Sequence, residues 1–179
     1  MLVMTAMRNT IGTTLAVGLA GLMVGCAGPR LGHYDVVVTP DSSLREGSTL
    51  PPVKVDVVGV KPADVSRWQS YSVDQYFSGS DSLRHDFAPF ARQLSFDANS
   101  DKPQTITKND PIWDEWAKAG VMKVFVLANA RTMQPGGGVD ARKIEVPMTT
   151  DRFDDRTKID IFIRKSGVDV ATPMKPVKE

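Results

Sequence analysis

Two segments of the chain place apolar side chains at every second position, and this pattern constrains the fold most strongly. In residues 53–60 valines alternate with Lys54 and Asp56, and in residues 158–164 three isoleucines occupy every second position. Successive side chains of a β-strand point to opposite faces of a sheet, so each pattern predicts a strand with one buried and one wet face. The chain is therefore expected to be built mainly from strands.

Six further segments have the composition of short strands and are bounded by turn residues. They are residues 34–39, 91–96, 105–107, 121–128, 141–146 and 168–171. The run at 121–128 is nearly all apolar, which predicts a central strand covered on both faces.

Two helical insertions are expected between the strands. The first follows Pro62, and the spacing of Ser72 and Gln75 is that of a capping box. The second begins at Asp110 and Pro111 and stops at Gly120. Seven or eight short strands with two small helical insertions predict a mainly β protein and a β-sandwich spanning residues 33–171 rather than alternating βαβ units. Residues 79–86 are expected to be a polar loop and residues 172–179 a loose tail.

Four aromatic residues gather in and after the first insertion: Trp68, Tyr71, Tyr76 and Phe77. We interpret them as an aromatic lid packed on a sheet. The alternative is an exposed stacking platform for a ligand.

The first 25 residues have the layout of a secretory signal, which is removed from the mature protein. Arg8 is their single charged side chain, and an apolar run follows over residues 11–24. A membrane-spanning helix needs about 20 apolar residues, so this run of 14 is too short for a comfortable span.

The run ends at Cys26, the only cysteine of the chain. Leu22-Met23-Val24-Gly25-Cys26 resembles a bacterial lipobox, although Met23 stands where leucine is usual. The resemblance implies an acylated Cys26, a tether over residues 26–32 and attachment to a membrane through several acyl chains. Ala27 in place of an aspartate favours the outer membrane.

Charge and cysteine content narrow the possible functions. Without residues 1–25 the chain has 154 residues with 21 basic and 21 acidic side chains, enough for one domain. A nucleic-acid-binding protein is not expected, because such proteins carry a basic excess. With Cys26 acylated no thiol is left for a disulfide, so packing alone must stabilise the domain.

The search for catalytic chemistry finds little. His33 and His85 are the only histidines, no spacing suits a zinc site, and Gly-x-Ser-x-Gly is absent. The triple glycine at 136–138 precedes an expected strand rather than the helix of a phosphate-binding loop. The aspartates of residues 151–155 alternate with arginines, which favours a solvated loop over a calcium site. We expect no enzyme, no metal and no cofactor.

Past the signal, the order of the segments resembles the outer-membrane lipoprotein family of the type VI secretion system (T6SS). The landmarks are a proline-led strand at 52–57, an aromatic helical insertion, a hydrophobic central strand at 123–127 and a closing hairpin at 159–170. The resemblance implies a transthyretin-like sandwich that faces the periplasm from the outer membrane. It also implies a structural role, in which the lipoprotein tethers the periplasmic domain of an inner-membrane secretion subunit to the outer membrane.

By analogy the partner would contact loops at one end of the sandwich. The loop at 41–51 is the first candidate, with Leu44, Arg45 and Glu46 as contacts, and Met133 and Gln134 in a later loop are the second. Because the first loop is rich in Ser, Gly and Thr, we expect it to bury little and to contribute little to stability.

Two other functions remain open from the sequence. One is a generic lipoprotein that binds a small ligand through the aromatic residues around Trp68 and Trp113. The other is an envelope-assembly or stress lipoprotein with a different protein partner.

Overall fold

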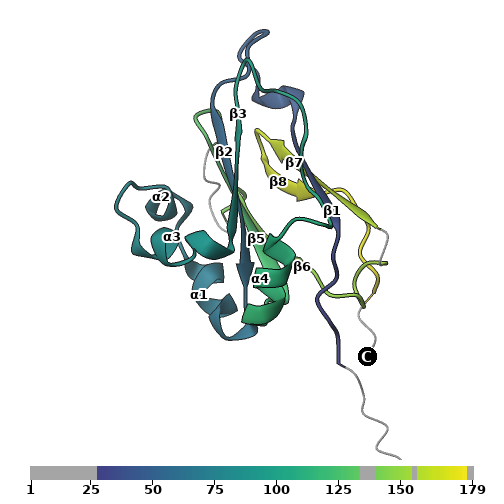
Figure 1. Ribbon diagram of the computed structural model, residues 1–179. Helices are drawn as coiled ribbons and strands as arrows, with labels where there is room; N and C mark the ends of the chain where they lie inside the picture. The colour runs from purple at the N-terminus through teal and green to yellow at the C-terminus, as the bar shows by residue number, and fades with distance from the viewer. Residues whose placement is uncertain (1–27, 134–139, 155–156, 177–179) are drawn as a thin grey trace, which may run out of the picture.

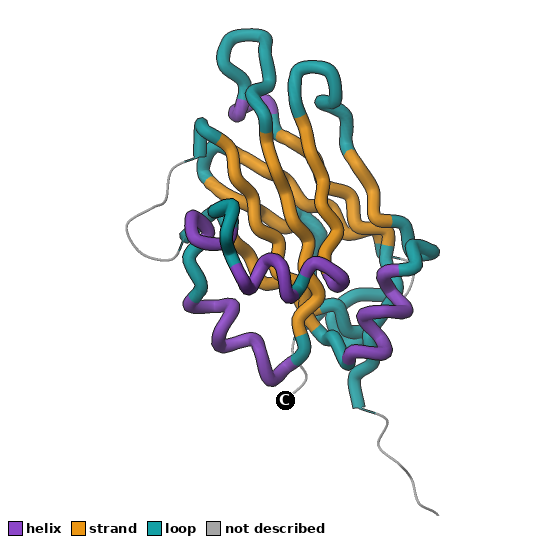
Figure 2. The backbone as a smooth tube through the Cα atoms, turned by 60° about the vertical axis from the view of Figure 1, so that its left-hand side comes forward, coloured by secondary structure: helices purple, strands orange, loops and turns teal. Residues whose placement is uncertain are grey.

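The structure, a computed structural model, describes residues 28–133, 140–154 and 157–176. Two four-stranded sheets pack face to face as a sandwich, and short helices cover the outside of one of them (Figure 1, Figure 2). The predicted fold class, mainly β with a β-sandwich, is therefore confirmed.

All eight predicted strands are present, with ends within two residues of the prediction. The first sheet has the order β4-β1-β7-β8 and the second the order β3-β2-β5-β6. The strands are β1 (Asp35–Pro40), β2 (Val53–Val60), β3 (Ala91–Phe96), β4 (Gln104–Ile106), β5 (Lys123–Ala130), β6 (Lys143–Pro147), β7 (Lys158–Arg164) and β8 (Gly167–Val170).

Strands β1 and β7 run parallel and form the centre of the first sheet, whereas the other strand pairs are antiparallel. Val36 lies opposite Ile159 and Val38 opposite Ile161. These four side chains are fully buried between the sheets. The alternation in residues 158–164 thus marks the core face of β7, as predicted.

Most of β2 and β5 is buried on both faces, which explains why both strands are mostly apolar. Val57 and Val126 point into the core between the sheets, whereas Val58 and Phe125 belong to a second apolar cluster on the outer face. The prediction of a central strand covered on both faces is confirmed for β5.

Two helical insertions are present, as predicted. Residues 62–90, here called the lid, contain α1 (Val65–Ser70), α2 (Val73–Tyr76) and α3 (Ser82–Asp86), and α4 (Ile112–Ala119) precedes β5. The Ser72 hydroxyl accepts a hydrogen bond from the Gln75 amide at 3.3 Å. Helix α4 ends at Gly120, whose φ of +73° favours glycine.

The expectation of a plain loop at residues 79–86 is wrong, because this segment contains α3. Asp81 caps the helix by accepting the Arg84 amide at 2.7 Å. Leu83 is fully buried and anchors the helix against the sheet. The polar composition masked a single buried leucine.

The aromatic residues of the lid pack on the sheet, as we preferred to interpret them. Trp68 stacks on Phe125 of β5 with ring centroids 5.7 Å apart and meets Phe87 edge-on at 5.1 Å. Trp68 and Tyr76 are fully buried, and Tyr71 and Phe77 are half-buried. The exposed stacking platform is therefore excluded.

The expectation of a wet outer face on β2 is wrong at Asp56, which the lid covers completely. Asp56 Oδ2 accepts hydrogen bonds from the Tyr76 hydroxyl at 2.9 Å and from Arg84 Nε at 3.0 Å. Burial and the neighbouring Asp56 carboxylate raise the pKa of the Tyr76 phenol, so it stays a donor. The polar Tyr76 and the charged Arg84 of the lid thus compensate for the cost of burying the Asp56 carboxylate.

Strand β6 and the residue before it also hold the lid in place through hydrogen bonds to α1 and α2. Lys143 Nζ donates to the carbonyls at the end of α1, at 2.7 Å to Trp68, 2.9 Å to Gln69 and 2.7 Å to Tyr71. A cation is favourable at a helix C-terminus. The buried Arg142 holds Asp74 of α2 through two hydrogen bonds at 2.6 and 3.0 Å.

The loop at 41–51 is not a segment with little to bury, so that expectation is wrong. It begins with the 3-10 turn η1 (Ser42–Leu44), and Leu44 (0% exposed) and Leu50 (2%) insert into the main core. Sequence composition hid this because two leucines among many polar residues suffice to anchor a loop.

Both ends of the described chain are hydrogen-bonded to the domain. Within the expected tether, Arg30 O accepts the Thr150 amide at 2.9 Å and the Gly32 amide donates to Met148 O at 2.8 Å. In the expected loose tail, Lys175 donates from its amide to Arg152 O at 2.8 Å. The described part of the tail is thus bonded to the domain.

We predict that Gly59→Ala destabilises the domain. A Cβ at this position of β2 would lie 2.3 Å from Trp116 Nε1, and that nitrogen donates to Phe90 O at 2.8 Å. Overpacking of this kind typically costs about 1–3 kcal/mol. Urea denaturation should therefore give a lower free energy of unfolding. Gly79→Ala is the control, since its Cβ meets nothing within 4 Å; equal loss in both variants would contradict the packing argument.

Leu44→Ala should also destabilise the domain, by about 2–5 kcal/mol, as for other buried leucines. Thermal unfolding of this variant should be compared with that of Ser48→Ala, which alters an exposed position of the same loop. Only the leucine variant should lower the midpoint by more than a few degrees. A mild effect of Leu44→Ala would mean that the loop does not depend on its core contact.

Candidate partner-binding site

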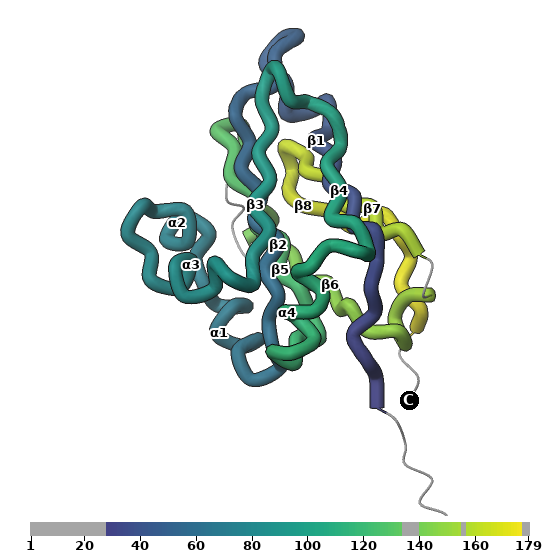
Figure 3. Tube along the Cα trace, viewed as in Figure 1, coloured from purple at the N-terminus to yellow at the C-terminus, as the bar shows by residue number. Residues whose placement is uncertain are grey.

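Three loops meet at one end of the sandwich because β3 and β5 both pair with β2 in the second sheet. Val53 at the start of β2 lies opposite Phe96 at the end of β3 and opposite Ala130 at the end of β5. The loops at 41–52, 97–103 and 131–133 therefore converge, and we call this end the rim. The rim lies opposite the end where the described chain begins (Figure 3).

The first rim loop presents a tight, well-formed tip. The Asp41 carboxylate accepts the Ser43 amide at 2.8 Å, and its hydrogen bonds with Ser43 lower the pKa of Asp41. Glu46 and Thr49 exchange backbone hydrogen bonds around Gly47, whose φ of +65° lies in the left-handed region. Beneath this tip Leu44 is locked in the core, so the tip is supported rather than free.

Ion pairs connect the three rim loops. Arg45 donates to Ser48 O at 2.9 Å and to Asp101 of the second loop at 2.5 Å, and the hydrogen bond from Arg45 lowers the pKa of Asp101. Glu46 pairs with Arg131 of the third loop. Exposed ion pairs are worth about 0–1 kcal/mol, so a partner could exchange them at little cost to stability.

Some of the predicted contact residues lie together on the surface of the rim, whereas others are buried in the core. Arg45 and Glu46 lie at the tip of the rim and are partly exposed. Leu44 (0% exposed) and Met133 (5%) belong to the core, so their prediction as direct partner contacts is wrong. Each has a large apolar side chain in an otherwise mostly polar loop, and this property buries it.

Two predicted site residues, Cys26 and Gln134, lie outside the described residues. Conversely, sequence reasoning missed Asp101 and Arg131 as rim residues. Each is a charged residue in a turn that follows an expected strand, which is the only signal that could have indicated them.

Beside the tip lies a shallow hollow of about 510 Å³, lined by Glu46, Thr49, Pro51, Pro52 and Arg131. One acidic and one basic side chain face it together with two proline rings. Such a surface can accept a protein segment with a small apolar contact and charges of either sign. Among the lining side chains, none is a catalytic nucleophile paired with a base.

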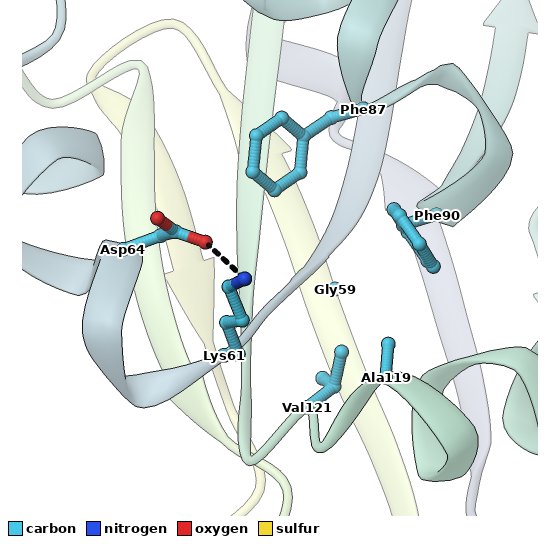
Figure 4. Close-up of a pocket in the computed structure, with 7 residues that line it drawn as sticks. All are labelled: Gly59, Lys61, Asp64, Phe87, Phe90, Ala119 and Val121. Carbon is cyan, nitrogen blue, oxygen red and sulfur yellow. Dashed lines mark ion pairs between the residues drawn. The ribbon is translucent and has the colours of Figure 1, made fainter.

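A second hollow lies between the lid and α4 (Figure 4). Phe87, Phe90 and Val121 surround it, Gly59 forms its floor, and Lys61 and Asp64 form an ion pair at its side, 3.7 Å apart. Its volume of about 200 Å³ is below the roughly 300–1,000 Å³ of typical ligand pockets.

The alternative of a ligand site around Trp68 and Trp113 is not supported. Both indoles are buried, and they belong to different apolar clusters on opposite faces of the second sheet. An aromatic recognition surface needs exposed rings that converge on one place.

Within residues 28–133, 140–154 and 157–176 no cluster of three or more histidine, cysteine or acidic side chains could hold a metal ion. In the same ranges no helix has the length and apolarity needed to cross a membrane.

No protein-family model matches the sequence, and no curated protein matches it. The structure, in contrast, matches solved structures over most of the chain.

A chain in the structure described as "Type VI membrane complex" has a TM-score of 0.51 and 10% identity, covering 80% of this chain and 100% of that chain. A chain in the structure of the T6SS protein TssM C-terminal domain from EAEC has a TM-score of 0.51 and 10% identity, covering 76% and 98%. The T6SS lipoprotein TssJ1 from Pseudomonas aeruginosa has a TM-score of 0.49 and 10% identity, covering 83% and 99%.

At 10% identity these likenesses establish the fold. The chain has the sandwich fold found in structures of the T6SS membrane complex, as the resemblance in its sequence predicted.

Proposed function

We propose that this protein is an outer-membrane lipoprotein of a T6SS-like secretion complex. Its sandwich, on the periplasmic side, tethers the periplasmic domain of an inner-membrane subunit through the rim. The observation that carries this proposal is the fold shared with the type VI membrane complex over 80% of this chain and all of the matching chain. The lipobox-like segment that ends at Cys26 supports it independently.

The placement of the two ends suits a tether. The described chain begins at the end of the sandwich that lies opposite the rim (Figure 1). A lipid on Cys26, two residues before Gly28, would hold that end at the membrane. The rim would then be the part of the domain that projects furthest from the bilayer, where a subunit from the other membrane must be met.

The chemistry of the rim suits a protein partner better than a small ligand. Arg45, Glu46, Asp101 and Arg131 offer charges of both signs in fixed positions on a supported backbone. Charges of this kind steer association and fix register. The core supports the rim from below through Leu44 and Met133, which is the role these two residues take instead of direct contact.

The rim residues can be tested without unfolding the domain. Arg45→Ala combined with Arg131→Ala removes both ion pairs of the rim, and we expect it to weaken binding of the periplasmic domain of the inner-membrane subunit at least tenfold. The unfolding midpoint should move by only a few degrees, because exposed pairs contribute little. Calorimetric titration of the two purified proteins gives the affinity.

A matched control is Lys118→Ala, which breaks the exposed ion pair with Glu115 on α4, away from the rim. This variant should bind like the wild type. Undiminished binding by the rim variant, with folding intact, would place the contact elsewhere on the domain.

Anchoring has its own test. Cys26→Ser should abolish incorporation of a labelled fatty acid and leave an unprocessed precursor, because no other cysteine can take its place. Met23→Leu, which restores the usual lipobox residue, should remain labelled and processed. Absence of label from the wild-type protein would contradict lipidation while leaving the rim hypothesis untouched.

A further inference from the structure

We infer that the end of the sandwich where the described chain begins is a membrane-seating surface that lies on the phosphate groups of an anionic phospholipid bilayer. We call it the seat and define it by Pro29, Arg30, Met122, Arg152, Met174 and Lys175. The inference rests on the proposed lipid anchor, and it adds that the folded domain itself touches the bilayer in a fixed orientation.

The seat is one continuous surface built from distant parts of the chain. Arg30 O accepts the Thr150 amide at 2.9 Å, and the Lys175 amide donates to Arg152 O at 2.8 Å. Arg152 also donates from its side chain to Lys175 O at 3.1 Å and reaches Met174 Sδ at 3.7 Å. The chain entry, the loop before β7 and the C-terminal segment are thus held together.

Chain length leaves this end little freedom. An extended residue spans at most about 3.6 Å, so an acylated Cys26 would hold Gly28 within about 7 Å of the point of attachment. From Arg30 onward the chain is bonded to the domain. Without a long linker, the seat must lie at the level of the lipid headgroups.

The composition of the seat suits that position. Met174 is 45% exposed, more than any other large hydrophobic side chain of the described residues. Arg152, which reaches Met174 Sδ, also lines a hollow of about 440 Å³, whose other lining residues are Pro29, Met122, Lys123, Pro147, Thr149 and Asp151. An apolar side chain next to such a hollow can be buried in the interface of a bilayer.

The charges of the seat suit phosphate groups. Arg30, Arg152 and Lys175 are basic, and their neighbours Asp151 and Asp154 are acidic, with Asp154 paired to Lys175 at 2.5 Å. Arg152 lines the hollow, and Arg30 directly follows Pro29, which also lines it. Basic side chains beside an apolar surface are attracted to anionic lipids.

The test uses the complete lipidated protein in vesicles of phosphatidylethanolamine and phosphatidylglycerol. Because acylation consumes the thiol of Cys26, a cysteine introduced by Met174→Cys can be labelled selectively with a fluorophore. Spin-labelled headgroup lipids should quench this fluorophore at least fivefold more strongly than one at Ser48→Cys on the rim. Equal quenching at the two positions would overturn the inference.

The charge contribution is tested in the same vesicles. Replacing phosphatidylglycerol by phosphatidylcholine, or introducing Arg30→Glu, should reduce quenching at position 174 at least twofold, whereas Lys118→Glu should not. Quenching that is insensitive to both changes would overturn the assignment of anionic phosphate as the ligand. Flotation of the protein with the vesicles reports anchoring separately, so a floating protein with an unquenched probe contradicts the seat alone.

Discussion

The structure depends on the pairing of β2 with β5, which is buried on both faces. Eight consecutive residue pairs join the two strands, from Val53 opposite Ala130 to Val60 opposite Lys123. One face of this ribbon closes the main core against the first sheet, and the other carries the lid. These strands are covered on both faces except near the rim, where Lys54 and Asn129 are exposed. The elements that cover them supply apolar side chains or partners for polar groups, as Tyr76 and Arg84 do for Asp56.

The lid covers the outer face of the second sheet in one well-defined position. Trp68 fills the outer face of the sheet, while Lys143 and Arg142 fix the backbone and side chains of α1 and α2. Apolar packing alone would allow the lid to slide across the sheet. Directional contacts at two sides restrict the lid to one position, so its helices remain short without being loose.

The periodicity of the sequence predicted the strands, whereas contacts between distant segments determine which polar and loop residues are buried. Alternation in β7 and the apolar run in β5 were sufficient to place these strands, since a strand's pattern reflects its two faces. The burial of Asp56 and Leu44 was not predictable, because each depends on a segment distant in sequence that covers it. At the rim, charge and loop position indicated Arg45 and Glu46, but only the register of β2 with β5 brings Arg131 to Glu46.

The parallel pairing of β1 with β7 has a consequence for how the protein is made. Its first contact joins Asp35 to Lys158, so the central pair of the first sheet cannot form until almost the whole chain is available. A chain that emerges from its N-terminus, whether from a ribosome or through a translocation pore, keeps β1 without this neighbour until the end. Non-local pairing of this kind slows folding, so the first sheet is completed only after the residues of β7 have been synthesised.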